Sequence, residues 1–540
     1  GSQLNYKAFG TSSIMFGDTT TGTISAANRN TGVGVDIFAA LTSGDSNTVM
    51  GTQSGAALTS GEYNAFYGDQ AGVAVTDGAL NTALGYYTLA TVTTADGNTA
   101  LGGQALAVTT SGANNTAVGM NSMVANTTGG TNTAVGVYSL DANTTASNNT
   151  ALGYASLSAN TTGSENVGVG LNALLTNTTA TQNTAIGTNA MYANTTGADN
   201  VAIGHNALDA NTTASNNTAV GKSALTANTT AEYNTAVGAS AGAAITTGAA
   251  NTAVGKSALE TATTAANNTA LGAYALRVST SGASNVAVGH SALALNTTGI
   301  QNVAVGFQAL DANTTAANNT AVGNEAMGTN TTGTQNAAFG VAALILNTTG
   351  SYNTALGPYA LKANTTASNN VAVGWEALVA NTTGASNIAV GRRALNLHTT
   401  GTENVAVGTD AMYATTTSSR NTALGHAALD AQTDGSGYNT AVGNNALTAN
   451  TSGTTNTAVG ANAGDALTTG SNNTSLGYEA DSTAVDASNE FTLGNASVSA
   501  LRCADTSIAA LSDRRDKKDI IDSSYGLEFI NKIRPVQFTW

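Results

Sequence analysis

Residue types that carry out chemistry are scarce in this chain. Its 540 residues include four His and a single Cys, Cys503. We find no phosphate-binding loop, no His-Glu metal helix and no Asp-rich calcium repeat. Asn-Thr-Thr triplets recur, as at 126–128, but they match glycosylation acceptors only in a eukaryotic secretory setting and are better explained as turns. We therefore expect no external catalytic site, no metal and no cofactor.

Composition excludes several other classes of protein. Charged residues make up 9% of the chain, the net charge is −15, and about half of the Lys and Arg residues lie in the last forty positions. A nucleic-acid-binding surface along the rest of the chain is disfavoured. There is no apolar run of about 18 residues and no signal-peptide pattern at the start, so we expect neither a membrane span nor a secretion signal. A particle assembled in the cytoplasm and released by lysis needs neither.

The elements that must position any functional surface are short repeats. A Gly returns every 17 residues from Gly17 to Gly425, and after one step of 18 it continues from Gly443 to Gly494. The template is N-(T/V)-A-(V/L/I)-G-x-x-A-L-x-A-N-T-T-G-x-x. The position four before the Gly is Asn in every unit except the two terminal ones, which carry Ser13 and Glu490. A strict period of this length predicts a solenoid whose terminal repeats are atypical.

Each repeat is too short for two helices, and its Thr-Ala-Val-Gly segment alternates as a short strand does. We expect an all-β coil with a second strand over Ala-Leu-x-Ala-Asn-Thr-Thr. The residue before each Gly is always apolar, so we predict that its column runs inside the stack, with a second apolar column four residues after the Gly. Representative repeat residues are Gly136, Gly204, Gly306, Asn132, Asn200, Asn302, Val135, Ile203, Leu140 and Leu208.

The repeated Asn and Gly have structural explanations. Asn side chains one coil apart can hydrogen-bond into a ladder, which we favour over a ligand-binding role. Gly suits either a left-handed turn or a place too crowded for Cβ, and the sequence leaves both open. Two large apolar side chains per coil give a thin core, so stacking is obligatory. The Ala columns would let neighbouring chains approach closely, and we predict a homotrimeric rod about 130 Å long.

Two resemblances add to this interpretation. Asn200-Val201-Ala202-Ile203-Gly204 resembles the N-x-A-I-G repeats in the heads of trimeric autotransporter adhesins, which implies a trimeric β-roll over residues 14–497. The period is longer here, and the Thr-Thr segment is absent from that family's pattern. The stretch that begins Leu511-Ser512-Asp513-Arg514-Arg515 resembles the opening of the intramolecular-chaperone domain at the C-termini of phage tail fibres and tailspikes.

The second resemblance implies a trimerising template that cuts itself away. It assigns the nucleophile to Ser512 and the base to Lys517, with cleavage beside Ser512 at 511–513. Such a pair works when the amine is partly desolvated and neutral. Alternatively, Ser512 and Asp513 cap a helix or turn and Lys517 is solvated. The chain reaches only Trp540, so either truncation disables cleavage or the protein keeps its chaperone.

Receptor contacts are expected where the repeat varies, just after the Gly and just before the Asn. Aromatic side chains at these positions could stack on the sugars of a host glycan. The candidates are Tyr63, Tyr233, Tyr352, Tyr438 and Trp375, with Tyr138, Tyr154, His205 and His290 at similar positions.

The sequence thus predicts four segments: a lead-in at 1–13, a repeat shaft at 14–497, a connector at 498–511 and the short α+β start of a chaperone at 512–540. Its expected function is a tailed-phage tail fibre in the virion, with copies of itself, other tail proteins at the N-terminus, and a host surface glycan or protein as partners. The alternatives are a bacterial trimeric surface adhesin and an ice-binding solenoid with stacked Thr-Thr pairs.

Overall fold

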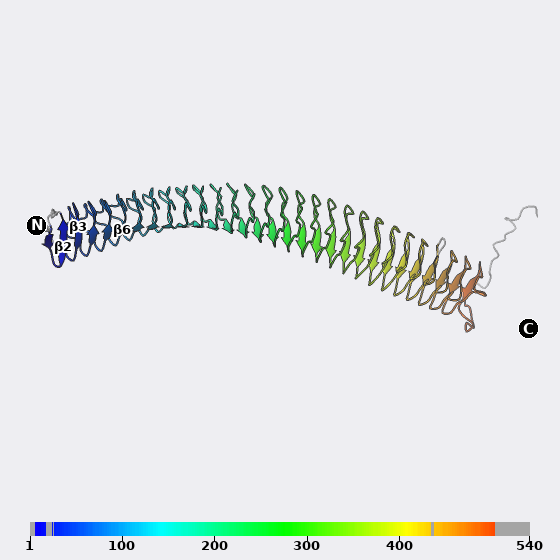
Figure 1. Ribbon diagram of the computed structural model, residues 1–540. Helices are drawn as coiled ribbons and strands as arrows, with labels where there is room; N and C mark the ends of the chain where they lie inside the picture. Colours follow the sequence, from blue (N-terminus) through cyan, green and yellow to red (C-terminus); the bar gives the residue numbers. More distant parts are fainter. Residues whose placement is uncertain (1–5, 18–23, 25, 434–436, 503–540) are drawn as a thin grey trace, which may run out of the picture.

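The computed structural model describes residues 6–17, 24, 26–433 and 437–502. These form one long, gently curved rod in which each repeat is one coil (Figure 1). The fold is an all-β solenoid of about 28 turns with coils of about 17 residues, as the sequence predicts. The described residues contain no helix, and therefore none that could cross a membrane.

Every coil contributes one short strand to a single sheet. The strands are β1 (Tyr6–Phe9), β2 (Ser13–Gly17), β3 (Thr31–Gly34), β4 (Thr48–Met50), β5 (Ala65–Tyr67), β6 (Thr82–Leu84), β7 (Thr99–Leu101), β8 (Thr116–Val118), β9 (Thr133–Val135), β10 (Thr150–Leu152), β11 (Val167–Val169), β12 (Thr184–Ile186), β13 (Val201–Ile203), β14 (Thr218–Val220), β15 (Thr235–Val237), β16 (Thr252–Val254), β17 (Thr269–Leu271), β18 (Val286–Val288), β19 (Val303–Val305), β20 (Thr320–Val322), β21 (Ala337–Phe339), β22 (Thr354–Leu356), β23 (Val371–Val373), β24 (Ile388–Val390), β25 (Val405–Val407), β26 (Thr422–Leu424), β27 (Thr440–Val442), β28 (Thr457–Val459), β29 (Thr474–Leu476) and β30 (Phe491–Leu493).

Identical positions stack directly above one another. From β2 onward each strand pairs in parallel with the next, so that Thr133 lies opposite Thr150 and Ala134 opposite Ala151. The exception is β1, which pairs antiparallel with β2. This hairpin makes β1 the edge strand at the N-terminal end of the sheet.

The strand faces are the reverse of the prediction. The alternation is present, but the Ala between the two larger residues points inward: Ala134 and Ala202 are fully buried, whereas Ile203 is 38% exposed. The prediction that Val135 and Ile203 run inside the stack is therefore wrong. The column four residues after the Gly is in the core as predicted, with Leu140 and Leu208 fully buried. Because Leu fills the narrow interior, only a methyl group fits on the strand opposite it.

The expected second strand is also absent from the described residues. After the Gly the chain runs through turns, with left-handed φ angles of 57° at Tyr138 and 53° at Leu140. These angles break the extended alternation that a strand requires. Hydrogen bonds between coils persist all the same, as from Leu140 N–H to the Ser156 carbonyl at 2.9 Å.

Both explanations of the repeated Gly hold. Gly204 has φ of +136°, and a Cβ on it would lie 2.6 Å from the carbonyl oxygen of Gly221 in the next coil. The position needs a backbone conformation that L-residues avoid, and it has no room for a side chain.

The Asn ladder forms as predicted. Asn200 donates its backbone N–H to the side-chain oxygen of Asn183 at 3.0 Å, and its side-chain nitrogen reaches the Ala214 carbonyl at 2.9 Å. The ladder continues into the atypical ends, where Asn30 N–H donates to Ser13 Oγ and Glu490 N–H donates to Asn473, both at 2.9 Å. The Asn of the Asn-Thr-Thr triplets makes a second ladder, as from Asn143 to Asn126 at 2.8 Å.

Candidate functional site

The residues expected to carry out self-cleavage lie outside the described part of the chain. They are Leu511, Ser512, Asp513 and Lys517. The lone Cys503 also lies outside it. Their assignment therefore stays a prediction.

The five aromatic residues predicted to contact a receptor are all exposed, from 42% for Trp375 to 62% for Tyr233. They do not gather into one site. Tyr63 and Tyr233 are ten 17-residue repeats apart in the sequence, and Tyr438 engages its neighbour Arg420, whose guanidinium donates to its hydroxyl at 2.7 Å. Each is therefore a single ring on the surface rather than part of a common platform.

A different set of aromatic side chains does form a continuous row. Tyr274, His290 and Phe307 follow the Gly by one or two residues in three consecutive coils. The Tyr274 and His290 rings are 5.7 Å apart and meet edge to face, while His290 and Phe307 are stacked at 5.6 Å with an angle of 18°. Lys256 and Arg277 place cationic groups over the Tyr274 ring at 5.5 and 5.8 Å. We call Tyr274, His290 and Phe307 the aromatic row.

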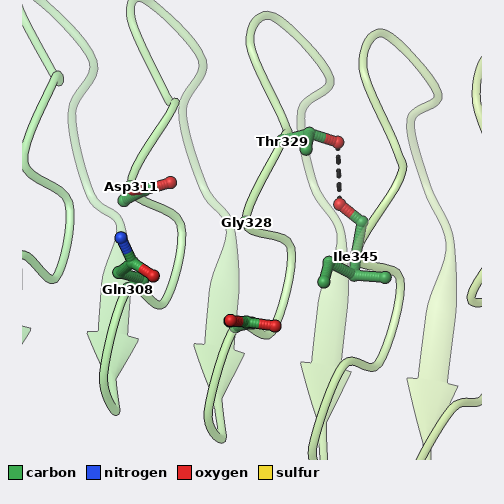
Figure 2. A pocket seen from close by; sticks show the side chains of 6 residues that line it. Gln308, Asp311, Gly328, Thr329 and Ile345 are labelled. Carbon is green, nitrogen blue, oxygen red and sulfur yellow. Dashed lines mark hydrogen bonds between the residues drawn. The ribbon is translucent and has the colours of Figure 1, made fainter.

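A pocket of about 270 Å³ begins in the coil of Phe307 and extends over the next two coils. Figure 2 shows its lining side chains, which come from three successive coils. It is lined by Gln308, Asp311, Glu325, Gly328, Thr329 and Ile345. None of these residues belongs to a strand, so the pocket lies on the turn segments that follow the Gly of each coil.

The polar groups of the pocket are mostly hydrogen-bond acceptors. Burial raises the pKa of the Asp311 carboxyl, and the nearby charge of Glu325 adds to this, against a hydrogen bond from the Ala312 backbone. Thr329 donates its hydroxyl to the Ile345 carbonyl at 2.7 Å, which leaves the hydroxyl oxygen free to accept. Gln308 adds an amide that can both donate and accept.

The pocket exists because one side chain is missing from a column. From the coil of Gly34 to that of Gly477, the position five after the Gly carries a side chain in every coil except one, where it is Gly328. A Cβ on Gly328 would make ordinary van der Waals contacts at 3.4 Å and beyond, so a side chain would fit there without a clash. Sequence reasoning missed this site, although the gap at Gly328 could have revealed it.

A second surface runs along the outer face of the sheet. The residue before each Gly, predicted to be buried, is partly exposed instead, and at many coils 36–48% of its surface is accessible. We call this column the aliphatic stripe. Its most exposed members are Val33, Met50, Leu84, Leu101, Leu152, Ile186, Ile203, Val237, Leu271, Phe339, Leu356, Leu424, Val459 and Leu493.

Within the described ranges, no group of three or more His, Cys, Asp or Glu side chains is placed to hold a metal ion. The pocket also lacks a nucleophile activated by a base. Its chemistry is that of binding, through acceptor groups and an apolar wall.

The comparisons bear on the C-terminal end of the chain. Residues 512–540 match the family model described as chaperone of endosialidase. The match agrees with the resemblance drawn from the Leu511-Ser512-Asp513 motif and covers only this terminal segment. No curated protein matches the chain.

Proposed function

We propose that this protein is the shaft of a homotrimeric tail fibre of a tailed phage, located in the virion. It would act as a stiff spacer that carries a host-binding surface away from the particle. The aliphatic stripe is the observation that supports this most directly. A row of large apolar side chains along a whole rod is unusual for a chain that stays alone in water.

The partner best suited to the aliphatic stripe is a second copy of the same chain. Ile186 and Ile203 lie opposite each other on neighbouring strands, and the same spacing continues along the rod. Another copy carries the same side chains at the same period, so contacts can be repeated at every coil. Fully burying one such side chain contributes about 1.5–3 kcal/mol, so many coils together would hold the copies firmly. The Ala side chains of the strands, by contrast, are buried inside each chain and do not face a partner.

The matched segment at 512–540 supports assembly by a C-terminal chaperone. All contacts of a solenoid join neighbouring coils, so its folding must start from a first coil, and a trimer also requires the copies to be aligned. A trimerising template would promote both the first coil and the alignment. Under this proposal Ser512 and Lys517 cut the template away once the fibre has formed. The N-terminus would join other tail proteins, and the exposed side of the rod would meet a host glycan or protein.

A bacterial trimeric surface adhesin is the second candidate, supported by the same stripe and repeat. Sequence beyond Trp540 separates the two, because more chaperone favours the phage fibre and a membrane anchor favours the adhesin. The ice-binding alternative is weaker. Thr144 of one Thr-Thr pair donates its hydroxyl to the Thr161 carbonyl at 3.1 Å, so half of each pair is used inside the solenoid.

The assembly is tested by sedimentation of the purified rod. We expect a mass of three chains for the native protein, and we expect the trimer of the double variant Ile186→Lys/Ile203→Lys, which places charges in the aliphatic stripe, to dissociate at a lower denaturant concentration. Asn444→Lys, at an exposed position after a Gly, is the control and should dissociate as the native trimer does. A native mass of one chain, or a double variant that dissociates at the native denaturant concentration, would contradict the proposed interface. Antibody labelling of virions in electron micrographs tests the location.

A further inference from the structure

We propose that the pocket beside Gly328 and the exposed side chain of Phe307 together form a binding site for a neutral oligosaccharide on the side of the rod. This inference rests on the proposed host-contacting role and names the ligand class and its place. This site differs from the single exposed aromatic residues that the sequence suggested, because here an exposed ring and a lining residue of a pocket are neighbours in the sequence.

The ring of Phe307 is covered on one face and stays partly exposed. His290, one coil earlier along the rod, stacks on it nearly parallel at 5.6 Å. The next coil carries Asn324 at the same repeat position and contributes Glu325 and Gly328 to the pocket. Phe307 remains 45% exposed. An exposed aromatic ring next in sequence to a polar pocket suits the CH-rich face of a pyranose ring.

The lining of the pocket begins at the residue after Phe307. Gln308 is the next residue after Phe307, and the backbone N–H of Glu325 donates to the Phe307 carbonyl at 2.9 Å. The coil that carries the ring and the coil that carries the second carboxylate are thus held together by the backbone ladder. A ligand that stacks on Phe307 has Gln308 and Glu325 within the same surface.

The acceptor groups favour a ligand rich in hydroxyl donors. The Asp311 and Glu325 carboxylates, the Thr329 hydroxyl oxygen and the Gln308 amide all line the pocket, with the Ile345 side chain as an apolar wall. Hydrogen bonds to charged acceptors are stronger than neutral ones. A volume of about 270 Å³ accommodates roughly one sugar ring and lies just below the usual range for ligand pockets.

The charge of the site selects against acidic sugars. Two carboxylates line the pocket, and the whole chain carries a net charge of −15. A sialic or uronic acid would place a third carboxylate among them, with a cost that no cation of the pocket offsets. The cation one coil beyond the pocket, Lys362, follows Ile345 at the same repeat position, and its ammonium group lies over the Tyr359 ring at 5.4 Å.

The site stays open in the proposed trimer. Its lining residues all lie on turn segments after the Gly, whereas the aliphatic stripe consists of the last residue of each strand. One side of the coil would therefore face the partner chains and another would face the host. A fibre built in this way presents three such sites around the shaft.

The test uses the full chain and saturation-transfer NMR with cellotetraose, maltotetraose, chitotetraose and mannotetraose as neutral probes and oligosialic and oligogalacturonic acids as acidic probes. We expect saturation to be transferred from the protein to at least one neutral probe and to none of the acidic probes. Gly328→Ile should abolish this transfer, because Ile345 shows that Ile is accepted at the same position one coil later. Phe307→Ala and Asp311→Asn should each weaken binding about tenfold.

Ala243→Ile makes the matched control, since it adds the same side chain at the same position of a coil outside the site and should bind as the native chain does. Sedimentation of each variant shows whether the rod still assembles, so a failure of binding is separable from a failure of the proposed trimer. Three results would each overturn the proposal. They are saturation transfer that Gly328→Ile does not change, stronger transfer to the acidic probes than to the neutral ones, and no transfer to any neutral probe.

Discussion

The backbone N–H of Asn149 donates a 2.9 Å hydrogen bond to the side-chain oxygen of Asn132, one coil earlier. The side-chain nitrogen of Asn149 donates to the Gly163 carbonyl, and its side-chain oxygen accepts the N–H of Asn166, both at 2.9 Å. Asn149 therefore joins its own coil to the coils on both sides, through its backbone N–H and its side-chain amide. The amide meets one buried backbone acceptor and one buried backbone donor, so a side chain of similar size that only donates or only accepts cannot satisfy both.

Asn149→Ala should loosen the rod locally. The substitution leaves the Asn166 N–H buried without a partner, which costs about 1–3 kcal/mol. The Gly163 carbonyl loses one of two donors and keeps the Asn160 side chain at 2.9 Å. We expect faster amide hydrogen exchange in peptides that span 149–166, measured by mass spectrometry. Asn444→Ala, the same change at an exposed position, should leave exchange in its own coil unchanged. Equal exchange in both variants would show that the ladder contributes nothing to stability.

Gly204→Ala should also destabilise its coil. Its φ of +136° disfavours any side chain, and the added Cβ would crowd the Gly221 carbonyl at 2.6 Å. Strain of this kind costs about 1–3 kcal/mol. Gly103→Ala is the control, because a Cβ there meets nothing within 4 Å and φ is not in the left-handed region. Thermal unfolding followed by circular dichroism should show a lower midpoint for Gly204→Ala alone.

Much of this architecture is readable from the sequence, because strict repetition places identical side chains in identical surroundings. The period, the Asn132 ladder and the buried Leu140 column all follow from it. Periodicity alone does not tell which face of a strand is inside. Here Ala134 faces inward because Leu140 already fills the interior, and Val135 is left outside. The pocket was missed for a related reason. Gly328 matters because the equivalent position in the neighbouring coils carries a side chain, and this coil has none there.

In the complete protein, Ser512→Ala should abolish self-cleavage, because it removes the hydroxyl that the proposed mechanism needs as nucleophile. We expect one uncut band on a denaturing gel for this variant and two fragments for the native protein. Ser512→Cys, which keeps a nucleophile, should retain some cleavage. Persistent cutting in Ser512→Ala would remove Ser512 from its assigned role, whereas an uncut native chain would mean that the chaperone stays attached.

The stability of the rod should fall in mild acid because of one buried imidazole. His398 is fully buried at a position where about half of the coils carry the second-ladder Asn, and its Nε2 lies 2.8 Å from the Gly401 carbonyl. Burial lowers the pKa of His398 below its ordinary value of 6.5, against the opposing effect of the Gly401 and Thr415 backbone. The unfolded chain therefore binds a proton more readily than the folded one, and stability rises with pH through this range.

As the pH falls below about 6.5, the His398 contribution should be lost progressively until the folded imidazole also becomes protonated. His398→Asn restores the usual ladder residue, so denaturant unfolding at pH 7.5 and 5.0 should differ less for this variant than for the native chain. The other buried and half-buried groups titrate equally in both proteins and cancel in the comparison. His205→Asn, at an exposed position, is the control and should leave the pH difference unchanged. An unaltered difference in His398→Asn would show that this imidazole does not cause the acid sensitivity.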